Sequence, residues 1–193
     1  MTVWFTSDTH WLHKNIIKYA NRPWDNCDDM CADMIANWNR VVKKTDDIYH
    51  LGDVSLGSTG KTIEILQSLN GRKHLIWGNH DSGLRKKQAF ISEFEWCRNY
   101  AELKIQDKNA PRGTQLLILC HYPLLTWNKA HHGSIMLHGH THGCIDDANK
   151  STRRLDVGVD SHNYTPISYK QVMGIMSERS YQLVGDEGSG SRK

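Results

Sequence analysis

Residues 2–10 of this chain, TVWFTSDTH, form an apolar run that is followed by an acidic residue and a histidine. Valine, tryptophan, phenylalanine and threonine favour extended backbone, so the run predicts a strand over residues 2–7. Side chains two residues apart on a strand share a face, and Asp8 and His10 can therefore bind one cation together. The first predicted strand thus ends in a pair of metal-binding side chains.

Four more groups of such side chains follow, and each of them also closes an apolar run. They are GD at 52–53, GNHD at 78–81, a single histidine at 121 and GHTH at 139–142. Neighbouring parallel strands lie about 4.8 Å apart, so side chains at their carboxyl ends can meet at one edge of a sheet. Five groups at five strand ends predict one shared metal site.

Predicted strands and helices alternate in the first half of the chain. Strands are expected at 2–7, 47–51 and 74–77, and helices at 15–19, 28–42 and 61–69. This order predicts βαβ units and a largely parallel sheet. In the second half, a hairpin is expected from 101–106 and 114–120, a helix at 168–176, and further strands at 134–138, 154–159 and 180–184.

Length and composition narrow the class of protein. A chain of 193 residues suits one domain, expected over 1–184, with a flexible polar tail over 185–193. Twelve histidines against three phenylalanines favour metal binding, because histidine is the commonest metal ligand. The net charge of +3 is too small to argue for extended nucleic-acid binding. Five cysteines without a CxxC pair argue against a disulfide framework, and no signal peptide or membrane span is evident, so a cytoplasmic protein is expected.

The mixture of nitrogen and oxygen donors indicates the kind of metal. Such a set fits manganese, iron, zinc, cobalt or nickel better than calcium. It contains more ligands than one tetrahedral ion needs, so two ions are expected. Ions about 3.5–4 Å apart can activate water and hold phosphoryl oxygens. A carboxylate is the expected bridge, with one oxygen on each ion, and the glycines beside the ligands permit tight turns and close approach of a substrate.

The five motifs together resemble the signature of the calcineurin-like metallophosphoesterases, which runs DxH, GD, GNH with a following acidic residue, a lone histidine, and GHxH. All five occur here in that order, from Asp8 to His142, over about two-thirds of the chain. The resemblance implies an α/β fold, namely a four-layer α/β/β/α sandwich of mixed β-sheets with the site at the strand ends.

The resemblance also implies a role for each motif residue. Seven side chains are implied as ligands of two metal ions: Asp8, His10 and His142 for one ion, Asn79, His121 and His140 for the other, and Asp53 between them. His80 is implied to lie beside the leaving group, where it donates a proton or stabilises developing charge. Asp81 is implied to orient His80.

The chain departs from the serine/threonine protein phosphatases of that family. Those enzymes extend the second motif to GDxVDRG, whose arginine binds phosphate, whereas residues 52–58 here are GDVSLGS. A phosphoprotein substrate is therefore not expected. The segments HKNII at 13–17, YHLGD at 49–53 and VGVD at 157–160 look more like small bacterial and phage members.

Three residues outside the motifs are candidate substrate contacts. His13 and Asn15 open a short predicted helix just after the first motif, a position suited to anions; the alternative is a solvated helix start. Arg22 can hold a phosphate or anchor a turn. Asp160 and His162 follow a late strand and are further candidates to touch the site. His50 and His138 are instead expected to be ordinary histidines of their strands.

The sequence thus predicts a dinuclear metal-dependent hydrolase of phosphoesters. The expected substrate is small and nucleotide-like, and GNHD rather than GNHE favours a phosphodiester by family analogy. A phosphomonoesterase and a non-catalytic metal-binding scaffold are the alternatives. No membrane partner is expected, and the oligomeric state stays open.

Overall fold

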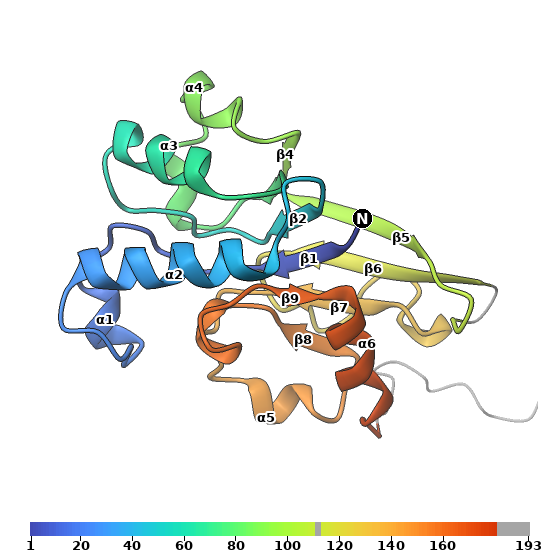
Figure 1. Ribbon diagram of the computed structural model, residues 1–193. Helices are drawn as coiled ribbons and strands as arrows, with labels where there is room; N and C mark the ends of the chain where they lie inside the picture. Colours follow the sequence, from blue (N-terminus) through green and yellow to red (C-terminus); the bar gives the residue numbers. More distant parts are fainter. Residues whose placement is uncertain (111–112, 181–193) are drawn as a thin grey trace, which may run out of the picture.

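The computed structural model describes residues 1–110 and 113–180, and Figure 1 shows two β-sheets with helices on both sides. The strands are β1 (Val3–Thr6), β2 (Asp47–His50), β3 (Arg72–Ile76), β4 (Trp96–Arg98), β5 (Tyr100–Gln106), β6 (Thr114–Cys120), β7 (Ile135–His138), β8 (Arg154–Asp156) and β9 (Ile167–Ser168). The helices are α1 (Ile16–Tyr19), α2 (Cys27–Val41), α3 (Thr59–Ser68), α4 (Gln88–Ile91), α5 (Asp146–Asn149) and α6 (Tyr169–Ser177). Short 3-10 turns include η1 (His80–Gly83), η3 (Ala130–His132) and η4 (Val159–Ser161).

Both sheets are mixed. The first has the strand order β4-β3-β2-β1-β9, in which β1 to β4 pair in parallel and β9 is antiparallel to β1. The second has the order β5-β6-β7-β8, in which β5 and β6 form an antiparallel hairpin and the other pairs are parallel. The α/β sandwich, the parallel first half and the hairpin are confirmed.

Alternation along the strands divides the core in two. On the first sheet Ile48 and Leu75 face α2 and α3, where they pack against residues such as Met34 and Leu66. Their strand neighbours Tyr49 and Ile76 point the opposite way, into a second core shared with the second sheet and α6. Helices α5 and α6 lie on the other side of the molecule from α2 and α3 (Figure 1).

Local signals set the ends of the longer helices. The Asn26 side chain caps α2 by accepting the amide of Asp29. A capping box between Ser168 and Gln171 starts α6. None of the described helices is long and apolar enough to cross a bilayer.

Sequence patterns missed the shortest elements. Strands β4 and β9 have three and two residues, too few for a periodic signal. The expected strand at 180–184 lies outside the described residues apart from Ser180, which belongs to no strand, and the expected tail at 185–193 lies wholly outside them.

Candidate metal centre

The loops that follow β1, β2, β6 and β7 are joined by backbone hydrogen bonds at the sheet edges. The amide of Asp8 donates to Gly52 O at 2.9 Å, and the amide of Gly139 donates to His121 O at 3.0 Å. Between the two sheets, the amide of His140 donates to both carboxylate oxygens of Asp8, at 3.1 and 3.0 Å. Strand ends from both sheets therefore meet at one place, as the motif pattern predicts.

Five of the seven predicted ligands have left-handed backbone: Asp8, His10, Asp53, His140 and His142, with φ between 47° and 71°. Non-glycine residues rarely adopt this conformation, which persists only where surrounding contacts impose it. The hydrogen bonds between the loops hold Asp8 and His140 in this conformation. The backbone of these five residues therefore adopts an unfavourable conformation that sets the direction of the ligand side chains.

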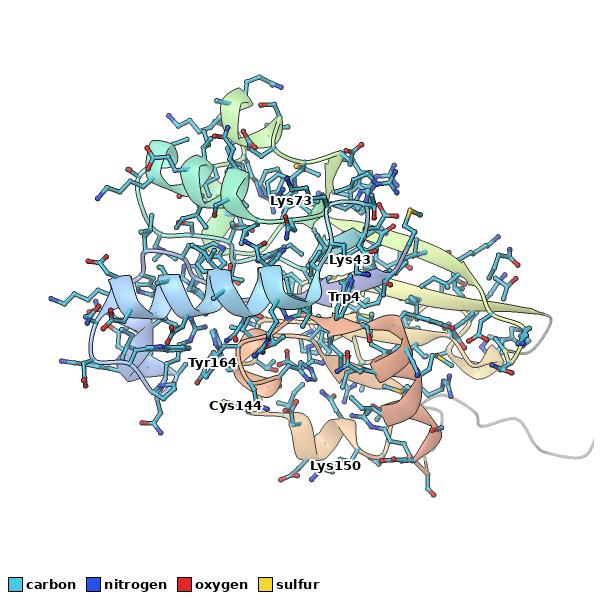
Figure 2. The ribbon with its side chains drawn as sticks, viewed as in Figure 1. Trp4, Lys43, Lys73, Cys144, Lys150 and Tyr164 are labelled. Carbon is cyan, nitrogen blue, oxygen red and sulfur yellow. The ribbon has the colours of Figure 1, made fainter. Side chains whose placement is uncertain are left out.

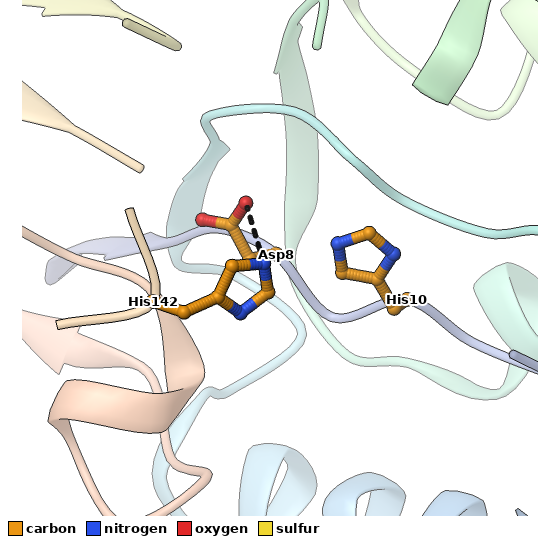
Figure 3. Close-up of side chains that lie close together, drawn as sticks. All are labelled: Asp8, His10 and His142. Atoms are coloured by element: carbon orange, nitrogen blue, oxygen red, sulfur yellow. Dashed lines mark ion pairs between the residues drawn. The ribbon is translucent and has the colours of Figure 1, made fainter. Parts of the chain in front are cut away.

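One group of candidate ligands consists of Asp8, His10 and His142, which we call the first position. Their ligand atoms lie within 4.8 Å of one another. Figure 3 shows the three side chains together, with the 4.0 Å ion pair between His142 Nε2 and Asp8 Oδ1 drawn as a dashed line. Asp8 and His10 are buried, and His142 is partly exposed.

A second group consists of Asp53, His121 and His140, whose ligand atoms also lie within 4.8 Å of one another. Asn79 adds its Oδ1 atom, 3.0 Å from His121 Nε2. We call these four residues the second position. Asn79 and His140 are exposed, so the second position is the more open of the two.

A single oxygen of Asp53 lies between the two groups. Its Oδ2 atom is 3.6 Å from His10 Nε2 and 3.5 Å from His121 Nε2. The other oxygen, Oδ1, accepts the amide of His80 at 2.9 Å. Oδ2 is therefore the oxygen that faces both groups, while the chain's own amide engages Oδ1; that each oxygen takes one ion stays a prediction.

Burial leaves one ligand atom of the first position without a partner and raises the cost of charge on another. His10 Nε2 is buried without a hydrogen bond. Burial, aided by nearby His142, lowers the pKa of His10 to about 2, so its imidazole is neutral and its lone pair is free. Burial and the neighbouring Asp156 raise the pKa of Asp8 well above its ordinary value. A cation would satisfy both residues, and the donor set therefore fits a metal ion.

At the second position, the arrangement of His121 and Asn79 also fits a bound cation. His121 Nδ1 donates to Leu51 O at 2.7 Å, and burial lowers the pKa of this histidine. Its neutral ring therefore presents the Nε2 lone pair to the carbonyl oxygen of Asn79. Two acceptors that face each other are satisfied by a cation held between them.

His80 lies at the mouth of the site. Its side chain is 46% exposed, and its Nε2 atom is 4.0 Å from Asp53 Oδ2. The implied link to Asp81 is wrong: the buried Asp81 carboxylate accepts the amides of Gly78, Asp53 and Val54 at 2.8 to 3.0 Å, and no described hydrogen bond joins it to the His80 ring. Three backbone donors engage the carboxylate, so Asp81 shapes the loops around His80.

The three candidate substrate contacts have different positions. His13 is next to the site, with its Nδ1 atom 3.4 Å from His10 Nδ1. Asn15 is exposed at the start of α1 and makes no capping hydrogen bond with its side chain. The expectation that Arg22 binds substrate is wrong, because its side chain is 0% exposed and its guanidinium is engaged by Asp160 and by the carbonyls of Asp8 and Thr9.

Known proteins are similar to this chain in sequence and in fold. The family model for calcineurin-like phosphoesterases matches residues 1–160. The chain belongs to the calcineurin-like phosphoesterase family. An uncharacterized protein of Methanocaldococcus jannaschii is 32% identical over 182 residues, covering 91% of this chain and 92% of that protein. The Gene 66 protein of Mycobacterium phage L5 is 31% identical over 179 residues, with 82% and 86% covered.

The fold also matches a solved structure. A protein of unknown function from Aquifex aeolicus superposes with a TM-score of 0.67 at 24% identity, covering 90% of this chain and 98% of that one. At this identity the similarity supports the sandwich fold alone.

In this family member two buried carboxylates outside the motifs support the site. Asp156 accepts the Thr141 hydroxyl at 2.6 Å and the amides of Gly143 and Gly158. Asp160 Oδ2 accepts His142 Nδ1 at 2.7 Å, so Asp160 touches the site as expected. The sequence does not single out Asp156, because it falls inside the strand expected over 154–159, whereas β8 ends at this residue.

The hydrogen bond between His142 and Asp160 shifts the pKa values of both residues. Burial lowers the pKa of His142, but the hydrogen bond to Asp160 and the nearby Asp8 outweigh it, so the net pKa is raised. Burial likewise opposes ionisation of Asp160, yet the hydrogen bonds from His142 and Arg22 hold its pKa below the ordinary value. Asp160 is therefore a carboxylate at neutral pH.

His50 and His138 lie as expected, whereas His162, a further candidate to touch the site, does not reach the ligands through a described hydrogen bond. His50 and His138 are buried, and both ring nitrogens of each have hydrogen-bond partners outside the ligand groups. His162 Nε2 donates to the Asp156 carbonyl at 2.7 Å and contacts none of the ligands through a described hydrogen bond.

Two motif glycines are required by close packing. A Cβ atom on Gly139 would lie 2.0 Å from Ser7 Oγ and 2.3 Å from Asp8 Oδ2. A Cβ atom on Gly78 would lie 2.2 Å from Asp53 Oδ1. In both cases the close approach is to a predicted ligand.

Proposed function

We propose that this chain is a metal-dependent hydrolase of phosphoesters that uses two metal ions. The observation that carries the proposal is the pair of ligand groups that meet at Asp53 Oδ2. Manganese, iron, zinc, cobalt or nickel fits these donors. When bound, the ions would supply an activated water and neutralise charge on the phosphoryl oxygens.

The protein groups around the ions have separate tasks. The seven ligands Asp8, His10, Asp53, Asn79, His121, His140 and His142 hold the ions in place. His80 is the proton donor to the leaving oxygen, since its ring is exposed at the mouth of the site and engaged by no described hydrogen bond. Asp81 keeps the loops that carry Asp53 and His80 in position.

We propose a phosphodiester of a small, nucleotide-like molecule as the substrate, with His13 and Asn15 as candidate contacts. A phosphomonoester carries one more negative charge than a diester and gains more from a cationic side chain at the site. Arg22, the arginine expected to serve that purpose, is buried and committed to Asp160. This arrangement favours the diester over the monoester.

The test is hydrolysis of bis-p-nitrophenyl phosphate and p-nitrophenyl phosphate by chelated protein restored with each of these metals. Metal-dependent turnover with preference for the diester is expected. The variant Asp53→Asn, purified in parallel, reports any contaminating phosphatase. Turnover of the monoester alone would overturn the diester assignment.

A non-catalytic scaffold is the alternative from another class. It predicts two bound ions per chain, no turnover of either ester with any metal, and no difference between wild type and His80→Ala. The complete ligand set and the exposed His80 ring favour catalysis.

A further inference from the structure

A buried ion pair joins two parts of the chain that are 138 residues apart. Arg22 Nε donates to Asp160 Oδ1 at 2.8 Å, and Arg22 Nη2 donates to Asp160 Oδ2 at 3.0 Å. The two side chains are 0% and 7% exposed. Removing both charges from water is unfavourable, so such a pair is weak evidence for stability and calls for another role.

Both members of the pair also contact the first position. The Arg22 guanidinium donates to the carbonyl of Asp8 at 2.7 Å and to that of Thr9 at 3.0 Å. These carbonyls belong to the DxH motif, whose backbone is left-handed at Asp8 and His10. Arg22 therefore holds the backbone that aims two of the three ligands.

Asp160 holds the third ligand. Its Oδ2 atom accepts the Nδ1 proton of His142 at 2.7 Å. This hydrogen bond determines the tautomer and leaves the Nε2 atom, which faces Asp8, free to bind a cation. One ion pair thus connects the ligands from the amino-terminal strand to the ligand from the GHTH motif.

Aromatic and sulfur atoms enclose the pair. The Tyr164 ring centroid lies 5.9 Å from the Arg22 guanidinium carbon and 4.5 Å from the ring centroid of Trp24. The thioethers of Met30 and Met34 lie 3.6 and 4.0 Å from Arg22 Nη1. Figure 2 labels Tyr164 beside α2, the helix that carries both methionines. Exclusion of water strengthens the charge interactions that hold the first position.

The second position has different supports. His121 Nδ1 donates to the backbone carbonyl of Leu51, and Asp53 Oδ1 accepts the backbone amide of His80. Among the described residues, no hydrogen bond or ion pair connects Arg22 or Asp160 to Asn79, His121 or His140. The ion pair acts on one position only.

We propose that Arg22 and Asp160 are positioning residues that set the metal affinity of the first position and leave that of the second unchanged. The inference rests on the metal-binding part of the proposed function and is independent of hydrolysis. Loss of a carboxylate that orients a metal-binding histidine typically weakens metal affinity 10- to 100-fold.

The test is a titration of chelated protein with Mn²⁺ alone, in two backgrounds that each keep one position. His121→Ala leaves the first position, and His142→Ala leaves the second. Adding Asp160→Asn to His121→Ala should weaken the remaining Mn²⁺ affinity 10- to 100-fold. Adding it to His142→Ala should change the affinity less than twofold, because Asp160 has no described contact with Asn79, His121 or His140 of the second position. Asp147→Asn, at an exposed aspartate, is the matched control and should change neither.

Each result of the Mn²⁺ titration either supports or overturns the proposed role of Arg22 and Asp160. Equal weakening in both backgrounds, or no weakening in the His121→Ala background, would overturn the proposal. Thermal unfolding of the metal-free chains shows whether a variant is folded. If Asp160→Asn is unfolded, Arg22→Lys, which keeps the buried charge but cannot make the bidentate contact, carries the same test. Wild type that binds none of Mn²⁺, Fe²⁺, Zn²⁺, Co²⁺ and Ni²⁺ would instead refute the proposed function.

Discussion

The first and second metal positions share Asp53 Oδ2 but are supported by different kinds of contact. Side-chain charges support the first, through the ion pair of Arg22 and Asp160. Backbone groups support the second, through the Leu51 carbonyl and the His80 amide. A substitution can remove a side-chain support but not a backbone one. The first position can therefore be tuned from outside its ligand set, whereas the second changes mainly through its ligands or its loops.

The two positions also differ in access. Asp8 and His10 are buried at the first, whereas Asn79 and His140 are exposed at the second, next to His80. We expect substrate to approach from the side of the second position.

Asp53→Asn should remove the connection between the positions. The amide keeps an oxygen for the His80 amide hydrogen bond but replaces the shared Oδ2 with a group that cannot bind a cation. Both Mn²⁺ affinities should fall, and metal-dependent diester hydrolysis should fall about 10³-fold or more. Metal content after dialysis and kcat/KM test this. One ion retained at wild-type affinity would show that Oδ2 is not shared.

His80→Ala should leave the metal affinity of both positions unchanged. Two ions should remain bound, while kcat falls about 10²- to 10⁴-fold through loss of the proton donor. The loss should be larger for a phenyl than for a p-nitrophenyl leaving group, since the poorer leaving group needs the proton more. Equal loss for both groups would assign His80 to charge stabilisation.

Asp81→Ala should destabilise the loops of the second position. It leaves three buried amides without an acceptor, so the free energy of unfolding of the metal-free protein should fall by about 3 kcal/mol or more. Urea denaturation measures this change. Asp156→Ala is the matched variant beneath the GHTH loop and should weaken the first position instead. If Asp81→Ala and Asp156→Ala lower the Mn²⁺ affinity of the same position, the two positions do not have separate supports.

His13→Ala should have the smallest effect. Its ring contacts His10 but belongs to neither ligand group, so Mn²⁺ stoichiometry should stay at the wild-type value. The KM for the diester should rise about two- to tenfold, as expected for one lost hydrogen bond. A changed stoichiometry with unchanged KM would make His13 a support of the first position rather than a substrate contact.

Sequence alone was sufficient for the family, the sandwich fold and the ligand groups. Strand propensity and helix periodicity are local properties, and the motif residues come directly after strands, whose carboxyl ends must meet in a parallel sheet. The division into two ligand sets came from the family resemblance, and the structure brings Asp8, His10 and His142 together, as it does Asp53, His121 and His140.

Tertiary structure alone decided the roles of Arg22, Asp81, Asp156 and Asp160. Each is a charged residue whose role depends on which distant groups surround it. Arg22 meets Asp160 across 138 residues, and no pattern in the sequence encodes that contact. Asp81 lies beside His80 in the chain, yet its carboxylate binds the amides of Asp53 and Val54 from another strand end. Local residue types determined where metal ligands lie, and burial among distant partners determined what holds them there.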